Sequence, residues 1–598
     1  MCGIAGFYAS TQTIDPRLQT YFSQSLSHRG PDGEGTFQTC TSSGKPLLLL
    51  HRRLSIVDLQ HGKQPLMGQD ILGKDAVLIL NGEIYNQESL RKKFTSYTFK
   101  TESDCEPLLP LYFEKGEKFA SDLRGMYAFA LYETRSNELI LGRDPFGIKP
   151  LYYRMDETGF AFASEITALL FPWEKFPPLE KSSQMQALNL QFSCGQKTMF
   201  SGIYRLLPGE MLFVLDGKIK KSVHLPALNY AQSQKKTKTQ EALKEFEETL
   251  LETLQAHLMA DVPVGLFYSK GVDSSILLRG LNLLGYLEIP AFHLIFEGEK
   301  SAIPDDFPLK ACFEEVLFEE EDFWKLLPLA AFIMDDFSAD YAILPTLKLS
   351  EAAQKKGLKV ILSGEGGDEI FAGYGRYKKA TRPRLFGGRS LREKSLLHGL
   401  GLLKESSSWR HDIQQAEREI FQHKELSSLQ KAQALDIEDW LPHDLMLKLD
   451  RTLMHFGIEG RPPFLDKDLA NFGFFLKDGL KLHRGQGKWI LKKWLEDQIG
   501  LDFFEKKKGF TPPISRWISK KAHILGPLLK HQEALKDICV PEKIEELFKK
   551  LIRDPVLKKE GMAAWILLFY TLWYKIHVEK IEWKANVFQI LGKRETIR

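Results

Sequence analysis

The chain has 598 residues, too long for a single hydrophobic core, so we expect two or three domains. Hydrophobic residues make up 43% and charged residues 27%, which is an ordinary globular composition. The net charge of +3 is small for this length, so nucleic acid is not an expected partner, although the basic cluster Lys506–Lys508 could serve a local site.

The cysteines and the apolar segments restrict the protein class further. Six scattered cysteines form no CxxC pair, which argues against a zinc ribbon or a disulfide framework. The N-terminus lacks the basic and apolar regions of a secretory signal. The longest charge-free apolar stretch, 561–574, has 14 residues, short of the roughly 20 that span a bilayer. We expect a buried helix there, no membrane partner and a cytoplasmic location.

From residue 1 to about 206, short apolar runs alternate with Gly, Asn, Asp and Pro, which predicts stacked antiparallel sheets. Helical stretches are few in this part; one is Glu106–Lys115. The polar run Tyr230–Lys238 is interpreted as a linker or the start of a helix. The predicted strands are CGIAGFY, LLLLHRRLSIVD, AVLILNGEIYN, MYAFALYE, ELILGRD and LYYR.

The pattern changes after this run. A periodic helix is predicted at Gln240–Met259, and strands and helices then alternate, which indicates a parallel sheet covered by helices on both faces. From about Lys378 onward the chain is predicted to be mostly helical. The predicted elements are the strands VGLFY, PAFHLIF and LKVILSG, with helices from Ser274 and around Thr346–Lys356.

Cys2 follows only the initiator Met1. Removing Met1 would leave a thiol next to a free α-amino group, whose pKa of roughly 7.7–8.0 suits it to act as a base for that thiol. Taken alone, Cys2 is more often an ordinary cysteine that happens to come early.

Other groups in the same part suit an amino acid whose distal carbonyl is attacked, and glutamine fits. Asn81 and the Gly82 N–H, in NGEIYN at the end of a predicted strand, are donors of the type that an oxyanion hole needs. Arg53 can bind an α-carboxylate, while Glu83 and Asp104 can hold an α-ammonium. Each has an ordinary alternative, since Asn-Gly is usually a hairpin turn.

Taken in order, the motifs of this part resemble the class II glutamine amidotransferase domain of asparagine synthetases. The resemblance implies an α+β N-terminal-nucleophile fold, an αββα sandwich, over residues 1–210. It implies Cys2 as nucleophile, Asn81 and Gly82 as oxyanion donors, and a glutamine site at Arg53, Glu83 and Asp104. The motifs are MCGIAGF, HRGPDGEG, HRRLSIVD, NGEIYN, ESDCE, GRDPFGIKPLYY and FASE.

The same family implies an ATP-dependent synthetase domain over residues 236–580, of the α/β adenine nucleotide α-hydrolase type with a parallel sheet and a helical C-terminal part; residues 581–598 are left as a tail. Its hallmark SGGxDS corresponds to SKGVDSS, and a second motif is SGEGGDEIFAGYGRY. Asp273 and Asp368 are the implied Mg²⁺ ligands. Glu365 and Lys488 are implied to act on the acyl-adenylate and the pyrophosphate. The implied ATP and pyrophosphate contacts are Ser269, Gly271, Asp273, Ser274, Ser275, Ser363 and Gly364.

Three departures from the family pattern lie on the ATP side. Lys270 stands where the family has glycine, at a cost of about 1–2 kcal/mol if φ is positive there. The segment 297–316 is about ten residues short. Gly460 and Pro462, in EGRPPFLD, replace a small aliphatic residue and a valine.

The leading hypothesis is a glutamine-dependent asparagine synthetase that uses ATP and Mg²⁺, forms β-aspartyl-AMP and channels ammonia. One alternative is a related amidotransferase acting on a different carboxylate, a sugar acid or a peptide. The other is a glutaminase with a degenerate synthetase domain. The sequence leaves open the acceptor, the effect of Lys270 and of the short segment, the use of free ammonia, the role of the tail and the oligomeric state, for which a homodimer is one option.

Overall fold

The computed structural model describes residues 2–171, 176–235, 237–298, 303, 307–382, 391–405, 409–500 and 512–592. The predictions for Lys506–Lys508, for the removal of Met1 and for the middle of the shortened segment fall outside these residues.

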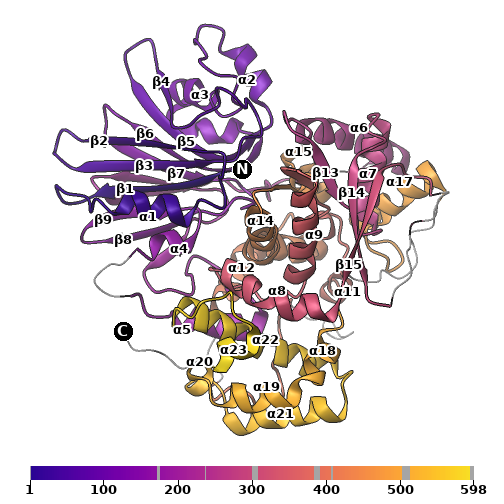
Figure 1. The fold of residues 1–598 in the computed structure, drawn as a ribbon. Helices are drawn as coiled ribbons and strands as arrows, with labels where there is room; N and C mark the ends of the chain where they lie inside the picture. Colours follow the sequence, from indigo (N-terminus) through magenta and orange to yellow (C-terminus); the bar gives the residue numbers. More distant parts are fainter. Residues whose placement is uncertain are drawn as a thin grey trace.

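In the first part of the chain, the described residues form two six-stranded antiparallel sheets stacked face to face (Figure 1). The strand orders are β10-β8-β9-β1-β3-β2 and β12-β11-β7-β6-β5-β4. The strands are β1 (Gly3–Ala9), β2 (Gly33–Cys40), β3 (Pro46–Arg53), β4 (Leu66–Gln69), β5 (Asp75–Ile84), β6 (Gly125–Glu133), β7 (Glu138–Arg143), β8 (Tyr152–Asp156), β9 (Gly159–Ala163), β10 (Ile203–Arg205), β11 (Glu210–Leu215) and β12 (Lys218–His224).

Alternating side chains of these strands build the layers. Ile4 and Leu49 of one sheet pack with Ile79 and Ala130 of the other in a core between the sheets. The opposite faces are covered by helices, α1 (Leu18–Ser25) and α4 (Ile166–Leu169) on the first sheet, and α2 (Gln87–Lys93) and α3 (Leu108–Lys115) on the second. This arrangement confirms the predicted αββα sandwich. The 3₁₀ helix η1 (Gly116–Asp122) and helix α5 (Lys181–Leu190) complete this part.

The described residues of the second part contain a five-stranded parallel sheet in the order β15-β14-β13-β16-β17. Three of its strands match the sequence prediction, whereas β15 and β17 had no predicted counterpart. Helices pack around this sheet, as expected for an α/β domain (Figure 1). The elements are α6 (Thr239–His257), β13 (Val264–Phe267), α7 (Val272–Leu283), β14 (Pro290–Phe296), β15 (Cys312–Phe318), α8 (Glu320–Ile333), α9 (Ile343–Lys355), β16 (Val360–Leu362) and β17 (Glu459–Arg461).

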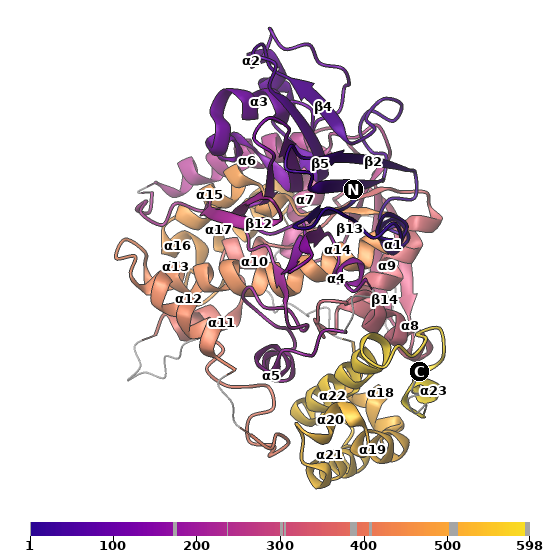
Figure 2. The ribbon, with the colours of Figure 1, turned by 90° about the vertical axis from the view of Figure 1, so that its left-hand side faces the viewer.

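The rest is helical, as predicted, and Figure 2 shows its last helices gathered at one end of the molecule. A π-helix, η3 (Asp436–Leu445), interrupts the α-helices. The others are α10 (Gly367–Ile370), α11 (Gly375–Ala380), α12 (His411–Phe421), α13 (Ser428–Leu435), α14 (Met446–Met454), η4 (Pro463–Leu465), α15 (Lys467–Phe475), α16 (Asp478–Lys481), α17 (Trp489–Ile499), α18 (Ile514–Lys520), α19 (Ala522–Lys530), α20 (Glu533–Lys536), α21 (Pro541–Arg553), α22 (Lys558–His577) and α23 (Val587–Gly592).

Helix α22 contains the apolar stretch predicted to be a buried helix, and most of its side chains are buried. Its indoles anchor a loop of the second part, since Trp565 Nε1 donates to the Ala339 carbonyl and Trp573 Nε1 to the Met334 carbonyl, both at 2.7 Å. Helix α23 lies within the predicted tail, and its Leu591 carbonyl accepts a hydrogen bond from Gln532. In the part of the chain that the structure describes, no helix has the length and apolarity to span a membrane.

Candidate active site

Cys2 directly precedes β1 of the first sheet, and it meets Asn81 of β5, in the second. The Cys2 backbone nitrogen donates to Asn81 Oδ1 at 3.0 Å. Asn81 Nδ2 is buried and has no hydrogen-bond partner among the described residues. One end of this amide therefore holds the Cys2 nitrogen, while the other end is left to donate to a ligand.

The segment that carries Asn81 is strand rather than turn. We expected NGEIYN at the end of a strand, but β5 continues through Ile84, and Gly82 pairs with Tyr127 of β6. Gly82 has φ +147°, and a Cβ atom there would lie 1.9 Å from the Met126 carbonyl oxygen. Glycine is thus required for β5 and β6 to approach this closely.

Two buried carboxylates lie next to this pair. Asp104 Oδ2 accepts a hydrogen bond from the Ile84 backbone N–H at 2.7 Å, and burial raises the pKa of Asp104 to about 6. Burial and the neighbouring Asp104 raise the pKa of Glu83 well above its usual value. Glu83 Oε2 has no hydrogen-bond partner within the described residues. The two groups together form a site suited to an ammonium group.

Arg53 is almost fully buried at the end of β3. Its guanidinium donates to the backbone carbonyls of Val57, Asp58 and Leu59 at 3.3, 2.5 and 3.2 Å. These carbonyls belong to the loop that follows β3, and they fix the guanidinium there. Strand β3 pairs with β1, the strand that follows Cys2.

Burial, and in addition the charges of Glu83 and Glu459, raise the pKa of the Cys2 thiol. Glu459 belongs to β17 of the second part of the chain, so the two parts meet at this site. Arg461, on the same strand, is fully buried, with Nε 2.5 Å from Glu459 Oε1 and Nη2 3.4 Å from Glu83 Oε1. Sequence reasoning identified EGRPPFLD as a landmark but gave these charges no role. The sequence shows both charges within this landmark but does not show that they are buried, which is what makes them informative.

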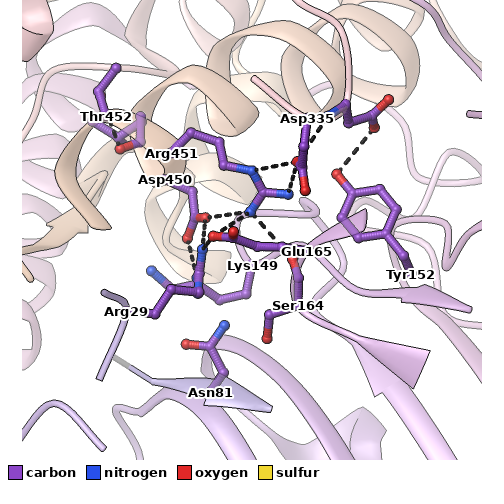
Figure 3. Close-up of polar contacts among 12 residues, drawn as sticks. Arg29, Asn81, Lys149, Tyr152, Ser164, Glu165, Asp335, Asp450, Arg451 and Thr452 are labelled. Atoms are coloured by element: carbon purple, nitrogen blue, oxygen red, sulfur yellow. Dashed lines mark hydrogen bonds and ion pairs between the residues drawn. The ribbon is translucent and has the colours of Figure 1, made fainter. Parts of the chain in front are cut away.

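A network of buried charges continues along the contact between the two parts (Figure 3). Arg29 Nη1 lies 2.8 Å from Glu165 Oε1 and 2.7 Å from Asp450 Oδ2, and its Nε donates to the Cys2 carbonyl at 3.2 Å. Arg451, which follows Asp450 on α14, pairs with Asp335 at 2.9 Å and with Glu165 at 3.3 Å. Arg29 therefore links the Cys2 backbone to Asp450 of α14.

The loop SKGVDSS joins β13 to α7, as the sequence predicts for a phosphate-binding turn. Lys270 adopts φ +59°, the left-handed conformation that favours glycine. Ser274 Oγ organises the turn: it accepts from the Ser269 N–H at 3.1 Å and contacts the Gly271 carbonyl at 3.2 Å. Ser275 is fully buried beneath the turn, with its Oγ 3.3 Å from Tyr268 Oη. The turn thus forms despite the lysine.

Asp273, in the first turn of α7, and Asp368, in α10, flank one lysine. Lys488 Nζ lies 2.6 Å from an oxygen of each carboxylate. Asp273 Oδ1 is buried and has no hydrogen-bond partner in the described part of the chain. A Cβ at Gly373 would lie 1.8 Å from Asp368 Oδ1 and 2.4 Å from Lys488 Cε, so glycine leaves the space that these side chains occupy. The structure therefore brings these three predicted residues together.

The second predicted motif touches the first. A Cβ at Gly364 would lie 2.9 Å from Asp273 Cβ. The Ser363 N–H donates to the Arg461 carbonyl at 2.9 Å. Glu365 Oε1 lies 3.5 Å from Lys448 Nζ. Sequence reasoning did not single out Lys448, a buried lysine of α14.

Lys448 also pairs with Asp340 at 2.8 Å. Burial opposes the charged form of Lys448, but Asp340, Glu365 and Asp444 together raise its pKa. The lysine is thus a permanent cation on the Glu365 side of the loop.

One departure from the family pattern has a local reason. A Cβ at Gly460 would lie 2.7 Å from Leu453 Cδ1 and 2.9 Å from Leu449 Cγ, both on α14. Glycine therefore lets α14 pack closely on β17, and the Gly460 carbonyl accepts from Lys149 Nζ at 3.4 Å. Nothing in the structure explains Pro462.

Comparisons with known proteins agree with this two-part architecture. Residues 1–225 match the family model described as a glutamine amidotransferase domain, and residues 245–575 match the one described as asparagine synthase. Asparagine synthetase [glutamine-hydrolyzing] 1 of Bacillus subtilis (strain 168) is 30% identical over 635 residues, with 97% of each chain covered.

Two further relatives carry similar names. Asparagine synthetase B [glutamine-hydrolyzing] of Escherichia coli (strain K12) is 32% identical over 424 residues, covering 67% of this chain and 69% of its own. Asparagine synthetase [glutamine-hydrolyzing] 1 of Arabidopsis thaliana is 28% identical over 522 residues, covering 83% and 75%.

Proposed function

Because the chain belongs to the asparagine synthase family and carries an N-terminal glutamine amidotransferase domain, we propose that it is a glutamine-dependent asparagine synthetase. The reaction converts ATP, aspartate, glutamine and water into asparagine, glutamate, AMP and pyrophosphate. The observation that carries the proposal is that one chain holds both half-sites, Cys2 with Asn81 and Asp273 with Lys488.

In the glutaminase half, the Cys2 thiol attacks the amide carbon of glutamine. Once Met1 is removed, the Cys2 nitrogen, held by Asn81 Oδ1, becomes the α-amino base that takes the thiol proton. Asn81 Nδ2 and the Gly82 N–H stabilise the oxyanion. Collapse of the adduct releases ammonia and leaves a thioester, which water hydrolyses to glutamate.

The glutamine pocket follows from the charges around this pair. Glu83 and Asp104 hold the α-ammonium group, whose positive charge would oppose the burial that raises the pKa values of both carboxyls. Arg53 binds the α-carboxylate through the same guanidinium that the loop carbonyls hold in position.

In the synthetase half, the β-carboxylate of aspartate attacks the α-phosphorus of ATP, giving β-aspartyl-AMP and pyrophosphate. Lys488 stabilises the charge on pyrophosphate, and Glu365 accepts a proton when ammonia displaces AMP. The N-terminus of α7 and the backbone of the two loops hold the leaving phosphates. The residues assigned to this cradle are Ser269, Gly271, Asp273, Ser274, Ser275, Ser363 and Gly364.

The residues around Lys488 fit a magnesium ion. Mg²⁺ is usually bound by one or two carboxylates together with substrate phosphates, and Asp273 and Asp368 supply two carboxylates, one of them with a buried oxygen that lacks a hydrogen-bond partner. When bound, the ion would neutralise charge on the phosphate oxygens. Asp273 and Asp368 are the residues that would hold it.

Ammonia must pass from Cys2 to the second half-site without loss to water. The contact between the two parts is lined by buried and mutually paired charges, including Arg29, Glu165 and Asp450. We assign this contact as the water-excluding wall of the route.

All six cysteines are free, in keeping with a cytoplasmic enzyme.

The test is pyrophosphate release by purified protein given Mg·ATP and glutamine, with and without aspartate. Aspartate-dependent pyrophosphate together with an equal amount of asparagine is the expected result. Pyrophosphate that needs another carboxylate would move the acceptor to a sugar acid or a peptide. Glutamate formed with no Mg·ATP binding would leave only a glutaminase.

A further inference from the structure

Arg461 contacts one residue beside each half-site, Glu83 in the glutaminase half and Ser363 in the synthetase half, through different atoms. Its Nη2 lies 3.4 Å from Glu83 Oε1, in the glutamine pocket. Its backbone carbonyl accepts the N–H of Ser363, the first residue of the second phosphate loop, at 2.9 Å. No other contact described above joins the glutamine carboxylates to that loop through one residue.

The Arg461 guanidinium is held by hydrogen bonds at Nε and Nη1 but not at Nη2. Its Nη1 donates to the carbonyls of His257 and Met259 at 2.7 and 2.8 Å, and its Nε donates to Glu459 at 2.5 Å. Nη2, in contrast, forms no hydrogen bond with the described residues, and Glu83 Oε2 also has none. The Arg461–Glu83 contact is therefore an ion pair without a hydrogen bond, between groups that each retain capacity for another partner.

Glutamine would change the balance of charge at this contact. Resting on the proposed function, an α-ammonium at Glu83 brings a second cation to a carboxylate that already faces Arg461. Both groups are buried, so little water screens them, and the guanidinium loses part of its attraction to Glu83. The Arg461 side chain is then held mainly by Glu459 and by the carbonyls of His257 and Met259.

From this geometry we infer that Arg461 is a positioning residue that couples glutamine binding at Glu83 to the phosphate loop at Ser363. A ligand can shift such a loop only through interactions that differ between its two positions. The Glu83–Arg461 contact supplies that difference, and β17, hydrogen-bonded to β16, transmits it.

The measurement is the dissociation constant of Mg·ATP, by calorimetry, with and without saturating glutamine. The full chain carries Cys2→Ala, so that glutamine binds without being hydrolysed. We expect glutamine to change the ATP dissociation constant about fivefold or more, and ATP to change the glutamine constant by the same factor, because binding linkage is reciprocal. Adding Arg461→Lys should bring this factor close to one while each ligand still binds alone.

The matched control is Arg124→Lys in the same background. Arg124 also joins the two parts, through Asp466 at 2.9 Å, but it does not touch Glu83. It should leave the coupling factor unchanged. A factor of one in Cys2→Ala alone, or the full factor in Cys2→Ala with Arg461→Lys, would overturn the inference while leaving the proposed function intact.

The other outcomes are also decisive. If Cys2→Ala protein does not bind glutamine at all, the proposed function fails and the inference falls with it. If Arg461→Lys does not fold, Glu459→Gln serves in its place, since it weakens the fixed side of Arg461 and leaves Glu83 intact. It should reduce the coupling factor at least by half, and an unchanged factor would contradict the role of Arg461.

Discussion

Lys488, directly before α17, donates a hydrogen bond of 2.6 Å to Asp273, which lies 215 residues earlier in the first turn of α7. The lysine thus offsets part of the charge of Asp273 and Asp368 before any nucleotide binds, and one negative charge of the pair is left for a second cation. This relationship links the helical C-terminal part of the chain to the phosphate-binding turn.

Asp273→Asn should abolish aspartate-dependent pyrophosphate release, by about 100-fold or more, because the amide cannot replace a carboxylate at Lys488 and Mg²⁺. Glutamine hydrolysis without ATP should persist. Asp468→Asn, at an exposed aspartate paired with Arg124, is the control and should leave both activities unchanged. Pyrophosphate release at the normal rate in Asp273→Asn would remove this residue from the site.

Lys270→Gly should retain or raise activity. Glycine removes the cost of about 1–2 kcal/mol of the left-handed conformation, offset by roughly 0.5–1 kcal/mol of extra chain entropy, so the melting temperature should change little. Lys270→Ala keeps the Cβ and removes the amine, which separates the two roles of the lysine. If both variants lose pyrophosphate release equally, the amine is required at this position.

Cys2→Ala should abolish glutamine-dependent asparagine formation while ammonium chloride still supports pyrophosphate release, because the thiol acts only on glutamine. The matched thiol control is Cys40→Ala, at an exposed cysteine of β2. Residual glutamine hydrolysis in Cys2→Ala above one part in a thousand would point to another nucleophile.

Arg29→Met should destabilise the protein by about 3–5 kcal/mol, because it leaves Glu165 and Asp450 buried with fewer cations. Chemical denaturation followed by intrinsic fluorescence measures this change. Arg17→Met removes an exposed ion pair to Asp15 and should not alter the unfolding midpoint. Equal midpoints for the two variants would show that the buried network adds no stability.

The pH dependence should follow the carboxylates of the glutamine pocket. The pKa of Asp104 is raised by burial to about 6, and only the ionised form attracts the α-ammonium of glutamine. The kcat/KM for glutamine should therefore fall as pH drops below about 6. In the enzyme–glutamine complex the ammonium favours ionisation, so the fall in kcat should begin at a lower pH.

The Asp104 carboxyl affects folding stability in the opposite direction: a rise in pH lowers its contribution to stability, whereas it favours glutamine binding. Because the folded-state pKa of Asp104 lies above its ordinary value of 3.8, the folded protein binds the proton more tightly, and this carboxyl lowers stability as pH rises from about 4 to 6. Asp104→Asn should remove that contribution. Coincident pH profiles for kcat and kcat/KM would exclude the proposed role of Asp104.

Local patterns predicted most of the sheets, since β1, β6 and β14 are continuous apolar runs with clear punctuation. They did not predict β15, an edge strand that carries the adjacent charges Glu314 and Glu315, nor β17, which has only three residues. Their strand character depends on the neighbouring strands β14 and β16 and not on their own composition.

The candidate site divides in the same way. Cys2, Asn81 and Asp273 stand in motifs with their own chemistry, so the sequence was sufficient to nominate them. Arg29 and Asp450 are 421 residues apart, and no local period encodes such a pairing. Arg461 was recognised only as part of the motif EGRPPFLD, because its role depends on a contact with Glu83 in the other half of the chain.

The two indole anchors of α22 have a consequence for how the protein is made. The loop that Trp565 and Trp573 hold carries Asp335, the partner of Arg451 at the contact between the two halves. These tryptophans are synthesised long after His224, the last residue of the sandwich's strand β12. Because domains generally fold as units in the order of the chain, the N-terminal sandwich folds before this part of its contact surface is anchored.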